Sequence, residues 1–135
     1  MALVIDVSVV ASWHFVDERS AAGAIVLKRL EAEEGLVPAL WWFELRNVLL
    51  TGERRRRASP EATAVFLNDL RDLSISIALL PDENAVMDLA RRHRLSFYDA
   101  SYLELAIRER VPLATFDSDL IAAAKAEGVP LVIKS

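Results

Sequence analysis

Short apolar runs alternate with longer amphipathic segments along the whole chain. The first run covers residues 2–6 and ends in Asp6, a pattern typical of a buried parallel strand. Further strands are expected at residues 36–37, 74–80, 111–115 and 129–133. The sequence therefore predicts at least one largely buried sheet.

Segments with helical periodicity and helix-start signals separate these strands. A short apolar helix is expected from Ser8, and Ser59-Pro60-Glu61 combines an N-cap, a first-turn proline and a first-turn acid. The remaining helices are expected at residues 21–34, 38–52, 59–73, 82–93, 97–110 and 117–127. This alternation predicts one α/β domain over residues 1–135, with a central, mostly parallel sheet between helices in three layers.

Composition narrows the class of protein. Of the 135 residues, 53% are hydrophobic, which supplies one core, and none is cysteine, which excludes disulfides, zinc–thiolate sites and thiol catalysis. The amino terminus lacks a basic signal-peptide region, and the uncharged runs are far shorter than the roughly 20 residues of a membrane span. We expect a cytoplasmic protein without membrane attachment.

The net charge of −4 argues against a protein that coats nucleic acid through its own cations alone. Two divalent metal ions would neutralise that charge. Nucleic-acid binding is therefore disfavoured only for a metal-free protein.

Four separated carboxylates are the candidates for chemistry: Asp6, Glu44, Asp99 and Asp117. Asp6 and Asp117 follow strands, and functional groups of parallel sheets gather at the carboxyl ends of strands. Asp99 lies in the first turn of a helix, and Glu44 lies beside an apolar helix face.

Each acid also has a structural interpretation. Asp6 and Asp117 are placed to cap helices, Asp99 to stabilise a helix dipole, and Glu44 to form a salt bridge. In one cleft, however, carboxylates about 4 Å apart would repel by roughly 4 kcal/mol at an effective dielectric of 20. Such a cluster must protonate or bind cations, and oxygen ligands favour Mg²⁺ or Mn²⁺ and phosphate chemistry.

Four segments carry a family resemblance, and they span essentially the whole chain. Asp6 and Ser8 lie in VIDVSVVASWHFVDE, Glu44 and Asn47 in VPALWWFELRNVLL, Asp99 in LSFYDASYLELA, and Asp117 in PLATFDSDL. In order and spacing these segments resemble the motifs of the PIN-domain ribonucleases, specifically the VapC-type toxins of toxin–antitoxin pairs.

The resemblance implies a PIN-like fold and an endoribonuclease whose Mg²⁺ or Mn²⁺ is held by Asp6, Glu44, Asp99 and Asp117. A metal-activated water would hydrolyse the RNA phosphodiester in line, leaving a 5′-phosphate and a 3′-hydroxyl. It also implies a homodimer silenced by a cognate VapB-type antitoxin in a heterotetramer or larger complex. Asp119 is a candidate fifth acid, and Ser8, Asn47 and Thr115 are candidates to support the ligands or contact the substrate.

Arg54–Arg57 and the aromatic residues allow two interpretations. The arginines form either a solvated helix end, which is favoured, or a patch that follows RNA phosphates. Trp13, Phe15, Trp41 and Trp42 are expected in the core or at a dimer surface rather than stacked on bases, and the adjacent tryptophans must face different ways.

Two other functions compete with a ribonuclease. A catalytically silent PIN-like interaction module would be expected to lack one of the four acids, and all four are present. A receiver-type phosphoacceptor domain would need adjacent acids after the first strand and a lysine at a strand end, whereas Lys125 falls inside a predicted helix.

Overall fold

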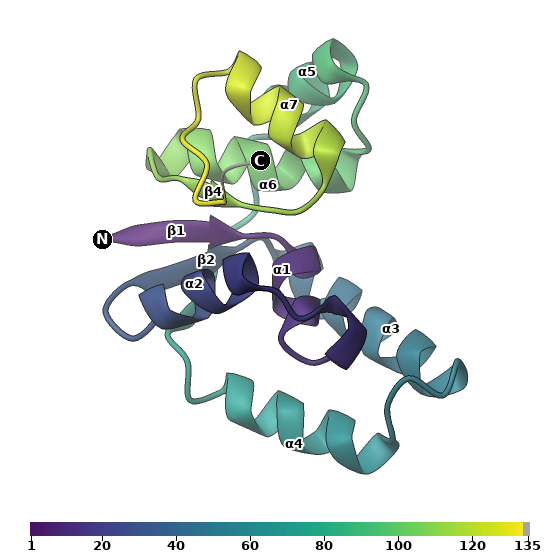
Figure 1. Cartoon of the computed structure of the whole chain (residues 1–135). Coiled ribbons are helices and arrows are strands. Elements are labelled where there is room, and N and C mark those ends of the chain that lie inside the picture. The colour runs from purple at the N-terminus through teal and green to yellow at the C-terminus, as the bar shows by residue number, and fades with distance from the viewer. Residues whose placement is uncertain (134–135) are drawn as a thin grey trace.

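A four-stranded parallel sheet lies between two groups of helices in the computed structural model, which describes residues 1–133 (Figure 1). The strand order is β3-β2-β1-β4, and every pair is parallel. The strands are β1 (Ala2–Ile5), β2 (Glu34–Val37), β3 (Ile75–Ile77) and β4 (Leu113–Ala114). The predicted α/β class and parallel sheet are confirmed.

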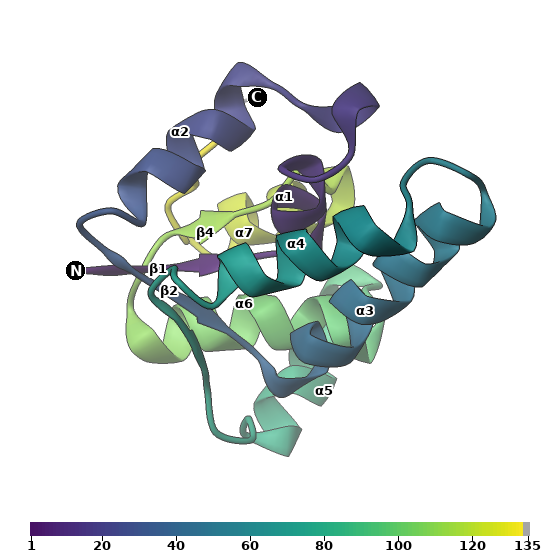
Figure 2. The same cartoon turned by 90° about the horizontal axis from the view of Figure 1, so that it is seen from below.

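Helices cover both faces of the sheet, as Figures 1 and 2 show. The 3₁₀ helix η1 (Val16–Glu18) and helices α1 (Val7–Ser12), α2 (Ala21–Arg29), α3 (Ala39–Arg54) and α4 (Pro60–Leu70) lie on one side. Helices α5 (Glu83–His93), α6 (Phe97–Glu109) and α7 (Ser118–Ala126) lie on the other. The arrangement is the expected three-layer α/β/α structure, and none of the helices in residues 1–133 is long and apolar enough to cross a bilayer.

The core follows from the apolar runs. Leu3, Val4 and Ile5 of the central strand β1 are fully buried because helices cover both faces of the sheet. On one side, every residue of α6 from 100 to 106 is buried. On the other side, α3 buries Trp41, Leu45 and Leu49 along one face.

Parallel pairing brings the ends of β1 and β4 together. Ile5 pairs with Ala114, and the Asp6 amide donates to the Ala114 carbonyl at 2.9 Å. The residues that follow these two strands, Asp6 and Thr115, therefore lie side by side at the carboxyl edge of the sheet.

Several predicted boundaries are wrong. Residues 129–133 do not form a strand: only Leu131 bridges Leu113, and Pro130 has no amide hydrogen to extend the ladder. Strand β3 is shorter than the predicted 74–80 because its partner β2 ends at Val37. Helix α2 ends at Arg29 rather than at 34, since Glu34 pairs with Ala2 in the sheet.

Candidate active site

Asp6 is a buried carboxylate at the carboxyl end of β1, and only 4% of its surface is exposed. The hydroxyls of Ser8 and Thr115 both donate to its Oδ2, at 2.7 and 2.8 Å. Burial raises the pKa of Asp6, and these hydrogen bonds oppose the rise only in part. Asp6 occupies the N-cap position of α1 but makes no side-chain capping bond, so the capping interpretation is wrong for this residue.

Glu44 lies half-buried on α3, and Tyr102 on α6 donates its hydroxyl to Glu44 Oε1 at 2.6 Å. Burial raises the pKa of Glu44, and the charges of Asp6 and Asp99 raise it further. The salt bridge to an arginine that the sequence allowed is absent from residues 1–133. Glu44 is instead partnered by the uncharged Tyr102, and the pKa of Tyr102 is raised by burial and by Glu44.

Asp99 lies in the first turn of α6, where Ser96 caps the helix by accepting from the Asp99 amide at 3.0 Å. Burial raises the pKa of Asp99, and the charges of Asp117, Asp6 and Asp119 add to that rise. This position also suits the helix dipole, as the structural interpretation required. A carboxylate here is therefore stabilised by its helix and destabilised by its acidic neighbours.

Asp117 caps α7: its Oδ1 accepts from the amides of Asp119 and Leu120 at 2.8 and 3.2 Å. The capping interpretation is confirmed for this residue. Its own amide donates to Thr115 Oγ1 at 3.0 Å, so Thr115 links Asp117 to Asp6 through one hydroxyl. Ser8 acts in the same way as Thr115: its hydroxyl donates to Asp6 and accepts from the Phe116 amide at 3.2 Å.

The structure thus brings the candidate acids into one electrostatic neighbourhood. Asp117 raises the pKa of both Asp6 and Asp99, and Asp6 raises that of both Glu44 and Asp99. Asp119, the candidate fifth acid, is exposed and lies near enough to raise the pKa of Asp99. Asn47 is exposed one turn beyond Glu44 on α3.

The donor chemistry of this neighbourhood fits a hard divalent cation. The side chains that meet there offer carboxylate and hydroxyl oxygens, which suit Mg²⁺ or Mn²⁺. Within residues 1–133, no three Asp, Glu or His side chains converge closely enough to hold one ion by themselves. That spacing is compatible with Mg²⁺, which usually binds one or two carboxylates and completes its octahedron with water and substrate phosphate.

Sequence reasoning missed Tyr102 as part of this site. The phenol meets Glu44 across 58 positions of sequence, a contact that no local pattern reveals. A signal was nevertheless present, because Tyr102 follows Asp99 by three positions on a helix and so faces the same way. The adjacent tryptophans do face different ways, since Trp41 is buried and Trp42 is exposed.

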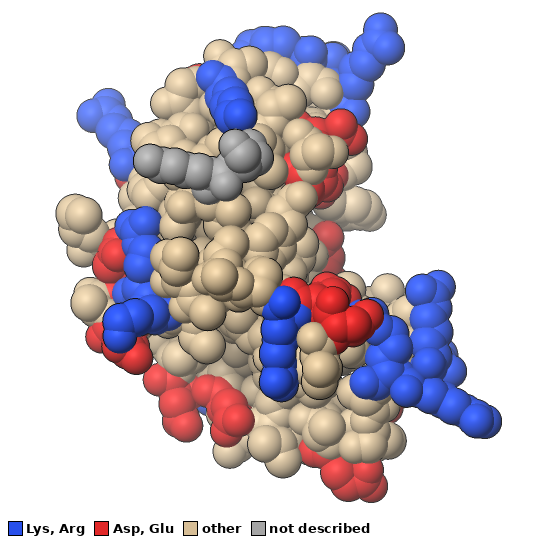
Figure 3. Space-filling view, viewed as in Figure 1, with Lys and Arg blue, Asp and Glu red and all other residues tan. Residues whose placement is uncertain are grey.

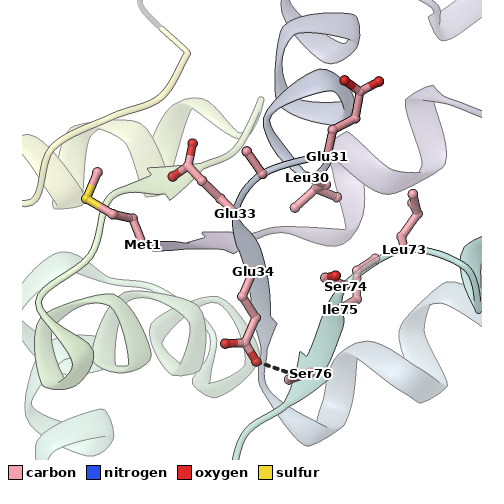
Figure 4. Close-up of a pocket in the computed structure, with 10 residues that line it drawn as sticks. Met1, Leu30, Glu31, Glu33, Glu34, Leu73, Ser74, Ile75 and Ser76 are labelled. Carbon is pink, nitrogen blue, oxygen red and sulfur yellow. Dashed lines mark hydrogen bonds between the residues drawn. The ribbon is translucent and has the colours of Figure 1, made fainter.

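A hollow of about 620 Å³ lies away from the carboxylates, at the amino edge of the sheet (Figure 4). It is lined by Met1, by residues 30–34 at the start of β2, and by residues 73–76 around the start of β3. Glu34 and Ser76 are hydrogen-bonded there, as the dashed line in Figure 4 marks. The amino edge offers neither the acids of the motifs nor their partners, so this hollow is not the candidate site.

Two of three comparisons relate the chain to known proteins. The family model described as PIN domain matches residues 3–126. The structure is similar to that of PAE2754 from Pyrobaculum aerophilum, at 25% identity and a TM-score of 0.75, over 98% of this chain and 90% of that one. It is also similar in fold to VapC20 of Mycobacterium tuberculosis, described as a sarcin-ricin-loop-cleaving toxin. The identity is 13% and the TM-score 0.59, over 90% of this chain and 94% of that one. A search of curated protein sequences found no match.

Proposed function

The chain belongs to the PIN-domain family, and on that premise we propose that it is a metal-dependent endoribonuclease and the toxin of a VapC-type toxin–antitoxin pair. PIN domains are generally nucleases. The observation that carries the proposal is the group formed by Asp6, Glu44, Asp99 and Asp117. These acids come from four separate segments. The charge of Asp117 raises the pKa of Asp6 and Asp99, and the charges of Asp6 and Asp99 raise the pKa of Glu44.

The metal ion, the four acids and their hydroxyl donors would have different roles. When bound, Mg²⁺ or Mn²⁺ would supply Lewis-acid activation of water and neutralise charge on the scissile phosphate. Asp6, Glu44, Asp99 and Asp117 would hold the ion, directly or through water. Ser8 and Thr115 fix Asp6 by donating to one of its oxygens, and Tyr102 fixes Glu44 in the same way.

The orientation of the ligands matters for metal affinity. A divalent ion binds more tightly to carboxylates that hydrogen bonds already hold in place. The hydroxyl of Thr115 holds Asp6 and accepts from the Asp117 amide, so a single residue aligns two of the acids. Uncharged donors are suited to this role, since a cationic partner would compete with the metal for the same oxygens.

The toxin assignment rests on the motifs and on fold similarity to VapC20, whose structure is described as that of a sarcin-ricin-loop-cleaving toxin. We propose RNA as the substrate, a VapB-type antitoxin as the partner, and a homodimer as the form that the antitoxin binds. Cytoplasmic action follows from that role. The presence of all four acids argues against a catalytically silent module.

The test uses purified protein freed of any antitoxin and a panel of RNAs, including ribosomal and transfer RNA. Cleavage is expected with Mg²⁺ or Mn²⁺, and EDTA should stop it. The products should carry 5′-phosphates. The Asp6→Asn and Asp99→Asn variants should fold normally, lose cleavage by at least about 100-fold, and bind Mn²⁺ more weakly in calorimetry. Metal-loaded protein that cuts no RNA in the panel, or Asn variants that cut at the normal rate, would contradict the proposal.

A further inference from the structure

The four consecutive arginines at the end of α3, Arg54–Arg57, do not share one role. Arg57 is an anchor: its Nη2 donates to Asp17 Oδ1 at 2.8 Å and to Glu18 Oε2 at 2.5 Å. Its guanidinium also lies 4.1 Å from the centre of the Phe15 ring. One arginine of the run therefore ties the end of α3 to η1 and contributes to structure.

The backbone around this anchor is fixed as well. The Arg57 amide donates to the Gly52 carbonyl at 2.8 Å, and Gly52 packs so closely on Phe15 that a Cβ there would overlap the ring. Arg56 has a φ of 57°, in the left-handed region, and its amide donates to the Glu53 carbonyl at 3.0 Å. The turn thus presents Arg54, Arg55 and Arg56 from a defined backbone.

These three arginines are exposed and form no ion pair within residues 1–133. By contrast, Arg91 lies 3.7 Å from Asp88, and Arg92 lies 2.7 Å from Glu127. The chain carries 20 acidic residues and 16 basic ones, so carboxylates are plentiful elsewhere. Three adjacent cations without a carboxylate partner are ready to meet an external anion.

Helix α3 connects these cations to the carboxylates. Glu44 and Arg54 are ten positions apart, which is about 15 Å along a helix. Asn47 and Thr51 lie between them on nearly the same face, at helical intervals of three and four residues. Figure 3 shows basic side chains gathered where Figure 1 places the end of α3, and acidic side chains along the indentation above them.

We infer that Arg54, Arg55 and Arg56 bind backbone phosphates of the RNA on one side of the cleaved bond, where the strand runs along α3 from the carboxylates. This inference rests on the proposed function. RNA fits better than an acidic protein segment because it is the polyanion that must also reach Glu44, on the same helix. In a chain of net charge −4, a local group of cations offsets the repulsion that RNA meets near the acids.

The experiment compares two triple variants that lose the same charge. One is Arg54→Gln, Arg55→Gln and Arg56→Gln. The control is Lys28→Gln, Arg71→Gln and Arg110→Gln, whose residues lie near helix ends leading into β2, β3 and β4, at the opposite edge of the sheet. All proteins carry Asp99→Asn so that a labelled twelve-nucleotide oligouridylate stays intact during binding, and thermal melts check that each variant is folded.

The arginine variant should bind the oligouridylate at least about tenfold more weakly at low salt. Its plot of log affinity against log salt should be shallower by about 2, because each lost contact to single-stranded RNA removes roughly 0.7 from the slope. The control should match its parent within about twofold, since only the total charge has changed. Restored to Asp99, the arginine variant should show a higher KM for long RNA with kcat little changed.

Equal affinity and equal slope for the arginine variant and its parent would overturn the inference. So would normal RNA binding combined with lost affinity for a polyglutamate peptide, which would assign the arginines to an acidic protein partner. Neither binding result would contradict the proposed nuclease function, which the cleavage test decides. A wild-type chain that cuts no RNA would contradict the proposed nuclease function even if the binding difference were found.

Discussion

At the scale of single residues, three of the four acids are held by uncharged partners. Hydroxyls donate to Asp6 and Glu44, and backbone amides donate to Asp117. No Lys or Arg within residues 1–133 forms a salt bridge with any of the four. The partners therefore orient the acids without neutralising them, and a cation remains the natural source of compensating charge.

Removing the Tyr102 hydroxyl tests whether orientation matters. Tyr102→Phe keeps the buried ring and deletes the hydrogen bond to Glu44. Because partners of metal ligands typically contribute 10–100-fold in affinity or activity, we expect Mn²⁺ affinity to fall by about tenfold or more. Stability should change by only about 1 kcal/mol. Calorimetric Mn²⁺ titration and a denaturant melt separate the two effects.

Tyr98→Phe is the matched control, since the Tyr98 side chain is 62% exposed one position before Asp99. It should bind Mn²⁺ like the parent protein. If Tyr102→Phe also binds Mn²⁺ like the parent, the phenol only fills space, and Glu44 needs no help to reach its position.

The sequence singled out the four candidate acids, which the structure brings near one another, but their hydrogen-bond partners could be predicted only in part. Ser8 and Thr115 lie within the motifs that contain Asp6 and Asp117, so their involvement was expected. The Tyr102–Glu44 contact depends on how α6 crosses α3, which is a property of packing. The cap at Asp6 was wrong for a related reason: the adjacent end of β4 supplies Thr115, and the Asp6 carboxylate accepts from that hydroxyl instead of capping α1.

At the scale of elements, arginine occupies three backbone positions with positive φ: Arg56, Arg94 and Arg110. Arg94 and Arg110 end α5 and α6 in the left-handed conformation that usually favours glycine. Arg110→Gly removes a conformational cost of about 1–2 kcal/mol, partly offset by chain entropy, so we expect the free energy of unfolding to rise by about 0.5–1 kcal/mol.

Arg91→Gly is the contrasting change, because Arg91 is exposed within α5. There glycine should lower the free energy of unfolding by about 1 kcal/mol. Urea melts of both variants measure the difference. If neither variant or both variants were stabilised, the left-handed conformation of Arg110 would not be the source of the expected gain.

Gly52 sets how α3 packs on the segment before η1. A Cβ at this position would overlap the Phe15 ring, which is itself buried. Gly52→Ala should therefore destabilise the protein by about 1–3 kcal/mol, although alanine is the better helix former. Leu50→Ala, at a half-exposed position of α3, should cost less. Combining Gly52→Ala with Phe15→Leu should recover part of the loss, and purely additive effects in urea melts would contradict this packing.

Helices were easier to predict than strand ends, for a physical reason. The start of helix α4 could be located from Ser59 and Pro60, because an N-cap and a first-turn proline are local signals. A strand extends only as far as its neighbour offers partners, so β3 stops after pairing with the short β2. The segment after α7 forms no strand for the same reason. Pro130 has no amide hydrogen to donate, and only Leu131 bridges Leu113.

At the scale of the whole molecule, the acid neighbourhood opposes folding when no cation is bound. Burial raises the pKa of Asp6 above its ordinary 3.8, so the folded chain keeps a proton at pH values where the unfolded chain has lost it. Unfolding then releases protons, and the free energy of unfolding falls as pH rises from about 4 through the raised pKa. Asp99 and Glu44 act in the same direction, whereas Glu127, whose pKa is lowered by His93 and Arg92, acts in the opposite one.

A comparison with Asp6→Asn isolates the contribution of the site. In EDTA, the wild-type protein should lose more stability than the variant between about pH 4 and pH 7, because Asn cannot ionise. Mn²⁺ should raise the melting temperature of the wild type more at about pH 7.5 than at about pH 5, where protons compete for the carboxylates. At a concentration about 100 times its dissociation constant, the ion should add about 2.7 kcal/mol, and much less in Asp6→Asn. Equal pH profiles and equal Mn²⁺ shifts in the two proteins would mean that Asp6 neither resists ionisation in the folded state nor binds the cation.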